Sequence, residues 1–333
     1  MRRALRPAVQ LAGPVLLLVA TAAIAAELSK ERQLEFENAV VMAAIVVALY
    51  VFVGNSGVIS FGHISFVAVG AYLAGLVSID PKTKAFTMPG LFPTLLHAHV
   101  GLAASLGLAA AAGGVYALAV GLPLMRLSGL PAGIATFAVL GITYNVLSYW
   151  SRVGPGVQTL SSVPETGGWT IAAGAIVAVV AAFAYQRSRF GRQLRATRED
   201  PPAARASGID VYRQRLFAFT LSGALAGLAG GLYVHQLGLI SPDLFYLDLT
   251  FVTLAMLVFG GVGSLWGAVV GALAISALNS FLGDAENTVD VGFSLTLPNG
   301  TRLVTVGAVM AAVLILRPSG LTGGREFGAR WLR

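Results

Sequence analysis

Residues 39–54 read AVVMAAIVVALYVFVG, a run without a single charged side chain. A helix needs about 20 mostly apolar residues to cross the hydrocarbon core of a membrane, and similar segments recur along the whole chain. They cover residues 10–26, 39–54, 62–79, 100–122, 129–149, 169–186, 216–238, 249–263, 265–283 and 301–316. These segments predict an all-α, polytopic transmembrane helical bundle of about ten spans.

The composition also indicates a membrane protein. Of the 333 residues, 56% are hydrophobic and 11% are charged, and the mean hydropathy is +0.78. A soluble globular domain carries about 25% charged residues. The polar stretches between the apolar segments are too short to bury cores of their own, so we expect one membrane domain over residues 1–333. The sequence has no cysteine, which excludes disulfides and thiolate metal sites.

Charged residues are distributed unequally between the two sides that ten spans would create. With the N-terminus inside, 16 of the 22 lysines and arginines lie on the inner side, and 11 of the 15 acidic residues lie on the outer side. This asymmetry follows the positive-inside rule and predicts that both termini are cytoplasmic. The net charge of +7 is therefore explained by orientation and not by nucleic-acid binding. Residues 1–26 also resemble a signal peptide, but a retained first helix is the preferred interpretation.

Glycines recur at four-residue spacing in two places, at Gly223, Gly227 and Gly231 and at Gly263, Gly267 and Gly271. Such spacing lines one helix face with small residues and lets backbones approach closely within a membrane. We therefore expect tight helix packing at both places; seams that slide during transport are the alternative. The glycines around residues 260–263 leave open whether a turn or a broken, re-entrant helix joins the neighbouring apolar segments.

The longest inner loop, residues 186–215, reads QRSRFGRQLRATREDPPAARASGIDVYRQR. It predicts a short helix, because Asp200 can cap the N-terminus, Pro201 suits the first helical position and Gly208 can adopt the left-handed conformation at the end. Ala203 and Ala204 lie within this helix, and their small side chains allow a partner to approach the backbone. The arginines nearby suit an acidic cytosolic partner or anionic lipid headgroups, although topology alone explains most of them.

The pattern Ala203-Ala204-x-x-x-Gly208 in a long cytoplasmic loop resembles the ATPase-docking loop of ABC importer permeases. The resemblance implies a docking role for residues 187–215, carried by Arg198, Glu199, Asp200, Ala203, Ala204 and Gly208. The pattern of that superfamily places a glutamate before the two alanines. This sequence has Pro202 there, so a salt bridge from that glutamate is not expected.

Further segments resemble the branched-chain amino-acid importer permeases of LivM type. They include GNSGVISFGH at residues 54–63, SPDLF at 241–245, GGVGSLWG at 260–267 and RPSGL at 317–321, together with residues 70–72, 121–129, 135–136 and 191–200. The matches occur in order from about residue 40 to residue 322. The external segment at residues 154–158 lacks the Thr-Gly-Gly run of the family, and the insert at residues 80–99 is a second departure.

The resemblance implies a five-protein importer in a bacterial inner membrane. Its members are this permease, a LivH-type sister permease, two cytosolic ABC ATPases and a periplasmic substrate-binding protein. The chain is then a transport subunit and not an enzyme, with no cofactor of its own, because the partner ATPases bind ATP and Mg. In agreement, the sequence contains no G-x-x-x-x-G-K-S/T phosphate loop.

Residues 54–66 are the candidate translocation path. Glycines loosen this stretch, and its polar side chains could offer hydrogen bonds to a zwitterion; they are Asn55, Ser56, Ser60 and His63. The alternative is that these groups satisfy one another between packed helices. His97 and His99 have no third ligand nearby and are interpreted as solvated surface, so no metal site is predicted.

Other functions remain open. The same importer class could carry urea, short amides or aromatic acids, because the binding protein largely sets selectivity. A stand-alone secondary transporter is disfavoured, since proton-coupled carriers need ionisable residues within their spans and few occur here. A membrane scaffold without transport is a third possibility. The loops at residues 151–168 and 284–300, the latter with Asp284, Glu286 and Asp290, are candidate surfaces for the binding protein.

Overall fold

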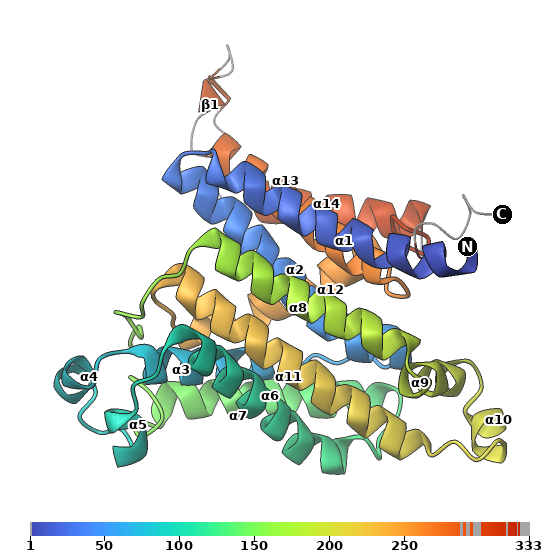
Figure 1. The fold of residues 1–333 in the computed structure, drawn as a ribbon, viewed down its shortest axis with the longest axis horizontal. Coiled ribbons are helices and arrows are strands. Elements are labelled where there is room, and N and C mark those ends of the chain that lie inside the picture. The colour runs from blue at the N-terminus through green and yellow to red at the C-terminus, as the bar shows by residue number, and fades with distance from the viewer. Residues whose placement is uncertain are drawn as a thin grey trace.

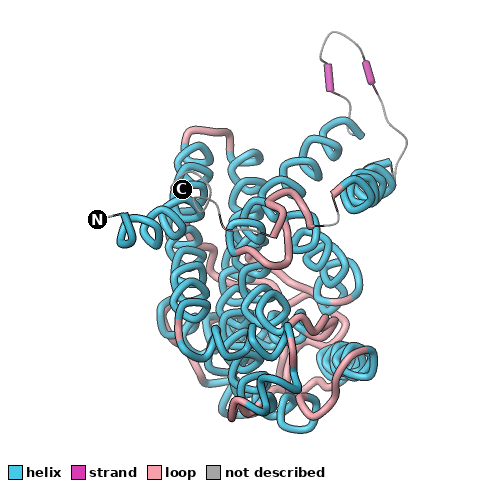
Figure 2. Tube along the Cα trace, turned by 90° about the vertical axis from the view of Figure 1, so that its right-hand side faces the viewer, coloured by secondary structure: helices cyan, strands magenta, loops and turns pink. Residues whose placement is uncertain are grey.

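The computed structural model describes residues 2–286, 289–290, 294–295, 301–317, 319–324 and 326. Its long helices run alongside one another across the view in Figure 1. The helices are α1 (Arg2–Ala26), α2 (Lys30–Ser56), α3 (His63–Ser78), α4 (Pro81–Thr87), α5 (Pro93–His97), α6 (Leu102–Leu124), α7 (Leu130–Tyr149), α8 (Gly168–Arg187), α9 (Arg189–Glu199), α10 (Pro201–Ala206), α11 (Val211–Leu237), the 3-10 helix η1 (Pro242–Phe245), α12 (Leu247–Gly260), α13 (Leu265–Glu286) and α14 (Thr301–Leu316). The two-residue strands β1 (Val289–Asp290) and β2 (Ser294–Leu295) pair antiparallel and project beyond α13 (Figure 2). Apart from these strands, the described chain is all-helical, as predicted.

The two ends of the bundle differ. Helices α9 and α10 lie at one end, here called the loop end, and α4 and α5 lie at the opposite end, called the insert end (Figure 1). Successive long helices alternate in direction between them, so that α2 runs toward the loop end and α3 runs back. The stretch 319–324 also lies at the loop end, where Leu321 N–H and Thr322 N–H donate to the carbonyl oxygens of Phe259 and Gly260 at the end of α12.

Helix α2 is the centre of the bundle. Every residue from Ala39 to Ser56 is buried, and α2 packs against α8, α11 and α13. A helix that is apolar on all faces can be enclosed by other helices without leaving a polar group unsatisfied, because its backbone bonds are internal. The charge-free run at residues 39–54 therefore becomes the core.

Helix α11 approaches α6 and α3 at backbone distance. A methyl group at Gly227 would lie within 3.0 Å of the Ala109 carbonyl oxygen, and one at Gly223 would lie equally close to the Ala117 side chain. One at Gly231 would stand 3.0 Å from Leu106. The absence of these methyl groups is what lets α11 and α6 touch over several turns, since lipid provides no hydrophobic drive for their association.

Helices α12 and α13 form a second close pair. A methyl group at Gly267 or Gly271 would lie within 3.0 Å of backbone oxygens of α12. Gly263 differs, because it precedes α13 and lies beside Gly324 of the C-terminal stretch. The three glycines therefore do not form one continuous helix face. A turn over residues 261–264, not a broken single helix, joins α12 and α13.

Each of the ten predicted segments coincides with a helix, but the prediction of about ten spans is not confirmed. Among the described residues, seven helices are long and apolar enough to cross a membrane, or eight if α3 and α4, bent by 112°, count as one broken span. Helix α3 illustrates the difference, because its 16 residues span roughly 24 Å, which is less than the hydrocarbon core of about 30 Å.

The insert at residues 80–99 forms α4 and α5 and is fastened by Lys84. The Lys84 side chain is buried, and its Nζ donates to the carbonyl oxygens of Leu76 (2.9 Å) and Leu95 (2.7 Å) and also to that of Ala98. The three bonds use all the donors of the ammonium group. They hold α4, α5 and the chain after α5 against the end of α3.

Replacing Gly227 by Leu should prevent the close approach of α11 to α6. We expect a loss of about 1–3 kcal/mol or more in the free energy of unfolding, because overpacking displaces backbone. Thermal unfolding of the detergent-purified protein measures it. Gly107→Leu is the matched control, since nothing lies within 4 Å of a methyl group at Gly107. Equal melting temperatures for the two variants would contradict the packing role.

Replacing Lys84 by Met should leave three buried or partly buried carbonyl oxygens without their donor, at a cost of about 1–3 kcal/mol. Limited proteolysis should then cleave the insert faster than in the wild type. The neighbouring Lys82 is exposed, so Lys82→Met should leave the cleavage rate unchanged. An unchanged rate for Lys84→Met would argue against the fastening role.

Candidate functional site

The α2–α3 junction, residues 54–66, lies at the loop end of the bundle. Helix α2 ends where Gly57 adopts φ +71°, and the Gly57 N–H donates to the Val53 carbonyl oxygen at 2.9 Å. Glycine adopts this left-handed conformation without steric cost. The linker over residues 57–62 is held by α7, because the Phe61 N–H donates to Thr136 Oγ1 at 3.2 Å. The linker is thus fixed on both sides although it has no regular structure.

His63 connects the junction to α11 directly and, through Ser222, to α2. Its Nε2 lies 2.7 Å from Ser222 Oγ of α11, and its Nδ1 lies 2.8 Å from Ser60 Oγ. The Ser222 hydroxyl itself donates to the Ala48 carbonyl oxygen of α2 at 2.6 Å, so Ser222 Oγ accepts from Nε2. In the neutral imidazole the hydrogen therefore lies on Nε2, and the Ser60 hydroxyl donates to Nδ1.

All four predicted path residues, Asn55, Ser56, Ser60 and His63, are buried, but they fall into two groups. Asn55 and Ser56 end α2: Asn55 Nδ2 donates to the Val51 carbonyl oxygen at 3.0 Å, and Ser56 Oγ accepts from Val58 N–H at 3.1 Å. Ser60 and His63 belong to the network that reaches Ser222. In this conformation each of the four groups uses a protein partner.

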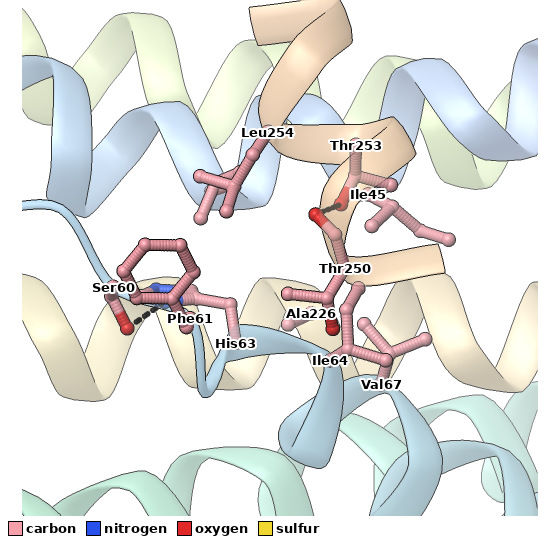
Figure 3. Close-up of a pocket in the computed structure, with 11 residues that line it drawn as sticks. Ile45, Ser60, Phe61, His63, Ile64, Val67, Ala226, Thr250, Thr253 and Leu254 are labelled. Atoms are coloured by element: carbon pink, nitrogen blue, oxygen red, sulfur yellow. Dashed lines mark hydrogen bonds between the residues drawn. The ribbon is translucent and has the colours of Figure 1, made fainter. Parts of the chain in front are cut away.

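A very small cavity lies beside His63 (Figure 3). Its volume is about 10 Å³, which is about the minimum that holds one water molecule. Ser60, Phe61 and His63 line it from the junction, and Thr250, Thr253 and Leu254 line it from α12. The two threonine hydroxyls donate to carbonyl oxygens one turn back, at Tyr246 just before α12 and at Leu249 within it. The space between α12 and the junction is therefore closed here.

A much larger cavity of about 940 Å³ opens next to it at the loop end. It lies between the end of α2, the linker, α12 and the stretch 319–324, and it shares Phe61 and Leu254 with the small cavity. Most of its lining is apolar, while Arg195, Arg198 and Glu199 of α9 contribute charge. Pockets for small molecules are typically about 300–1,000 Å³, so this space can hold a solute of amino-acid size.

Another cavity, of about 410 Å³, lies toward the insert end between α2, α12 and α13. Three carboxylates line it, those of Glu35, Asp243 and Asp248. Asp243 Oδ1 accepts a hydrogen bond of 2.8 Å from the Tyr144 hydroxyl. The charged side chains that line the two cavities therefore differ: two arginines and one glutamate line the cavity at the loop end of α12, and three carboxylates line the cavity at its other end.

The loop over residues 187–215 contains the predicted short helix. Asp200 caps α10, because its Oδ1 accepts from Ala203 N–H at 3.0 Å, and Gly208 adopts φ +78° after the helix. Ala203 is exposed and Ala204 is buried. The helix therefore presents one of its two alanines to solvent and packs with the other. Glu199 and Arg198 belong to the preceding helix α9.

Helix α9 was not predicted, although its sequence carries a signal. Gly191, Leu194 and Thr197 recur every third residue and are all buried, with arginines between them. A short amphipathic helix of this kind has its apolar stripe on one side. The sequence also gave no indication for Glu326, whose carboxylate accepts from Leu265 N–H at 2.9 Å at the start of α13. Burial raises the pKa of Glu326, while hydrogen bonds from the backbone of α13 oppose that shift.

His97 and His99 are exposed in the insert. In the part of the chain that the structure describes, no three His, Cys, Asp or Glu side chains are grouped as metal ligands would be.

Comparison with known proteins identifies the protein family. The family model described as the permease component of branched-chain amino acid transport systems matches residues 37–316. No solved structure was found to match the chain.

Individual relatives agree with this match. The chain is 27% identical over 308 residues to the high-affinity branched-chain amino acid transport system permease protein LivM of Escherichia coli (strain K12), and 26% identical to that of Salmonella typhimurium; each alignment covers 82% of this chain and 65% of the relative. The chain thus spans less than two thirds of the length of these proteins. It is also 30% identical over 197 residues to the autoinducer 2 import system permease protein LsrC of Klebsiella pneumoniae, with 56% of this chain and 55% of the relative covered.

Replacing His63 by Ala should remove the bridge between the junction and α11. Ser222 Oγ and Ser60 Oγ would lose a buried partner, which costs about 1–3 kcal/mol, and the free energy of unfolding in detergent should fall by that amount. His99→Ala, at an exposed position, is the control. If His63→Ala unfolds like the wild type, the bridge contributes nothing to the stability of this conformation.

Proposed function

The chain belongs to the family of permease components of branched-chain amino acid transport systems, and from this premise we propose that it is the membrane subunit of an ATP-driven importer. In this role it translocates branched-chain or related amino acids across the inner membrane. The LivM relatives are longer than the part that aligns with this chain. The solute and the assembly are therefore inferred for this chain from its own residues.

The observation that carries the proposal is α10. It is a capped helix at the loop end, short enough to act as a single rigid element, with the methyl group of its own Ala203 exposed. A cytosolic ATPase needs a small, firmly held surface that it can grip without displacing long side chains. Ala203 and the exposed Gly208 supply such a surface, and Arg198, Glu199 and Asp200 precede it.

The charge distribution supports the orientation. Eight arginines between Arg187 and Arg215 gather at the loop end, whereas Glu35, Asp80 and Asp243 lie toward the insert end. A basic loop end faces the cytoplasm by the positive-inside rule. The termini are then cytoplasmic, and the insert, residues 151–168 and the segment after α13 face the periplasm. Of the candidate contacts with a binding protein, the side chains of Asp284, Glu286 and Asp290 lie outside the described residues.

The complete importer contains further subunits. We assign to it a LivH-type sister permease, two cytosolic ABC ATPases and a periplasmic substrate-binding protein. The ATPases bind ATP and Mg, and this chain contributes no cofactor and no metal site. Closure of the ATPases pushes α10 and switches the membrane subunits between outward and inward access.

The solute path follows the face of α12. The large cavity at the loop end and the small cavity beside His63 share Phe61 and Leu254, which places these two side chains between a space of solute size and a closed one. Opening this point requires the Ser60–His63–Ser222 network to move. Asn55, Ser56, Ser60 and His63 are therefore path residues through their control of the junction, with direct contact to solute arising only after it opens.

The same scaffold accommodates other small polar solutes. Urea, short amides and aromatic acids are alternatives, because the binding protein selects what is delivered. A stand-alone secondary transporter is the different-class alternative. Co-purification separates the two classes: a stable complex with ATPase subunits supports the importer, and ion-driven uptake by the lone protein in liposomes would exclude it.

Replacing the exposed Ala203 by Gln should block the approach of an ATPase to α10. We expect the amount of co-purified ATPase to fall on the order of tenfold, equivalent to ~1.4 kcal/mol, with the melting temperature of the permease unchanged. Ala203→Ser keeps a small side chain and should retain wild-type association. Undiminished association for Ala203→Gln would remove α10 from the docking surface.

A further inference from the structure

We infer that Arg195 and Arg198 are positioning residues that fasten α9 to the C-terminal end of α2, so that a displacement of the loop helices moves α2 and the junction. The inference rests on the proposed function, because it names the step by which motion of α10 reaches the solute path. It assigns a second role to two arginines that topology alone would explain.

The first observation is the way in which α2 ends. The last four carbonyl groups of a helix have no partner within that helix, and the helix dipole makes this end attractive to cations. Arg198 Nη1 donates to the Gly54 carbonyl oxygen at 2.8 Å. Arg195 Nη1 donates to Asn55 Oδ1 at 3.0 Å. Both arginines therefore reach across from α9 and bind the last turn of α2.

Arg195 also connects α9 to the end of α8. Its Nη2 donates to the Gln186 carbonyl oxygen at 2.7 Å, and the Gln186 side chain in turn accepts a hydrogen bond of 2.6 Å from the Tyr50 hydroxyl of α2. The planar guanidinium group directs separate N–H donors at the two acceptors in one fixed geometry, whereas the donors of a lysine all rotate on a single nitrogen. One side chain thus sets the relative position of α2, α8 and α9.

Helix α9 is stiff enough to transmit a push. Leu194 and Thr197 are buried, and a methyl group at Gly191 would lie within 3.0 Å of the Tyr185 carbonyl oxygen, so that α9 sits directly against the end of α8. Asp200 both ends α9 and caps α10. A displacement of α10 is therefore delivered to α9 without an intervening flexible segment.

The end of α2 leads directly into the candidate path. A methyl group at Gly57 would lie 2.9 Å from Arg198 Cγ, so the stem of Arg198 covers the residue at which α2 stops. The linker that follows contacts α7 through Thr136, and His63 contacts α11 through Ser222. Both arginines also line the cavity of about 940 Å³. Moving the last turn of α2 would change the shape of this cavity and the closure beside His63.

Arg192 provides a control from the same helix. Its Nη1 donates to the Arg187 carbonyl oxygen at 3.1 Å, so its hydrogen bond stays within the α8–α9 corner and does not reach α2. If the arginines of this loop acted only through their charge, Arg192, Arg195 and Arg198 would be equivalent. The structure distinguishes them by their partners.

The test uses the complete importer in proteoliposomes, with uptake of leucine and hydrolysis of ATP measured on the same sample. For Arg195→Met, at a position outside the proposed docking residues, we expect ATPase co-purification and ATP hydrolysis to persist, while leucine uptake per ATP hydrolysed falls about tenfold, within the usual 5–150-fold range of coupling between sites. Arg192→Met should keep the wild-type ratio. Arg195→Lys, which keeps the charge but lacks the planar fork of donors, should recover part of the loss.

A second measurement follows the junction itself. The sequence has no cysteine, so a single Ile59→Cys in the exposed part of the linker can be labelled selectively with a thiol reagent. Addition of ATP should change its labelling rate in the wild-type background and leave it unchanged in the Arg195→Met background.

The possible outcomes distinguish a failure of the fastening role from a failure of the proposed function. A wild-type ratio of uptake to hydrolysis in Arg195→Met, or an ATP-dependent labelling change that persists there, would overturn the fastening role and leave the importer intact. Loss of ATPase co-purification in Arg195→Met would also overturn it, since Arg195 would then shape the docking surface. If the unmodified chain associates with no ATPase, the proposed function itself fails before any variant is compared.

Discussion

The structure depends on one constraint: a charge-free helix must be enclosed, and the backbone that leaves it must find partners within the protein. α2 is buried from Ala39 to Ser56 because its own backbone bonds are internal. Its last carbonyl groups and the irregular linker after Gly57 are different, since a membrane protein has little water at hand to satisfy them. Arg198, Thr136 and the Ser56 hydroxyl supply those partners. The end of α2 is therefore the point at which the bundle, the loop helices and the proposed solute path meet.

Enclosure of α2 requires its neighbours to pack tightly. In lipid this packing depends on close approach of backbones, because the tails around the protein are as apolar as its side chains. The contacts at Gly223 and Gly227 bring α11 onto α6, and those at Gly267 and Gly271 bring α13 onto α12. The polar bridges of His63 then fix α3 and α11 relative to α2. Tight seams and a few buried hydrogen bonds thus give the scaffold rigidity around one closed space.

The family assignment and this architecture are consistent. On the proposed function a partner ATPase supplies the energy, and the apolar segments of this chain contain few ionisable groups with which to use an ion gradient. The loop end combines the partly exposed α10, which is the proposed docking element, with the firmly packed α9, and α9 is hydrogen-bonded to α2 beside the cavity. On the proposed function, the arginines orient the protein in the membrane through their charge, and two of them also transmit motion through their geometry.

The sequence by itself determined the class, the positions of the ten apolar helices and the caps of α10, because these depend on local composition and on residues a few positions apart. Asp200 and Gly208 could be assigned from spacing alone. Only the tertiary structure decided which helices are long enough to span, that Gly263 lies outside the α13 face, and that Asn55 pairs with Arg195, 140 residues away. It also brought His63 to Ser222 across 159 residues. Such partners are set by how the helices pack, and one sequence carries no local signal for a contact between distant segments.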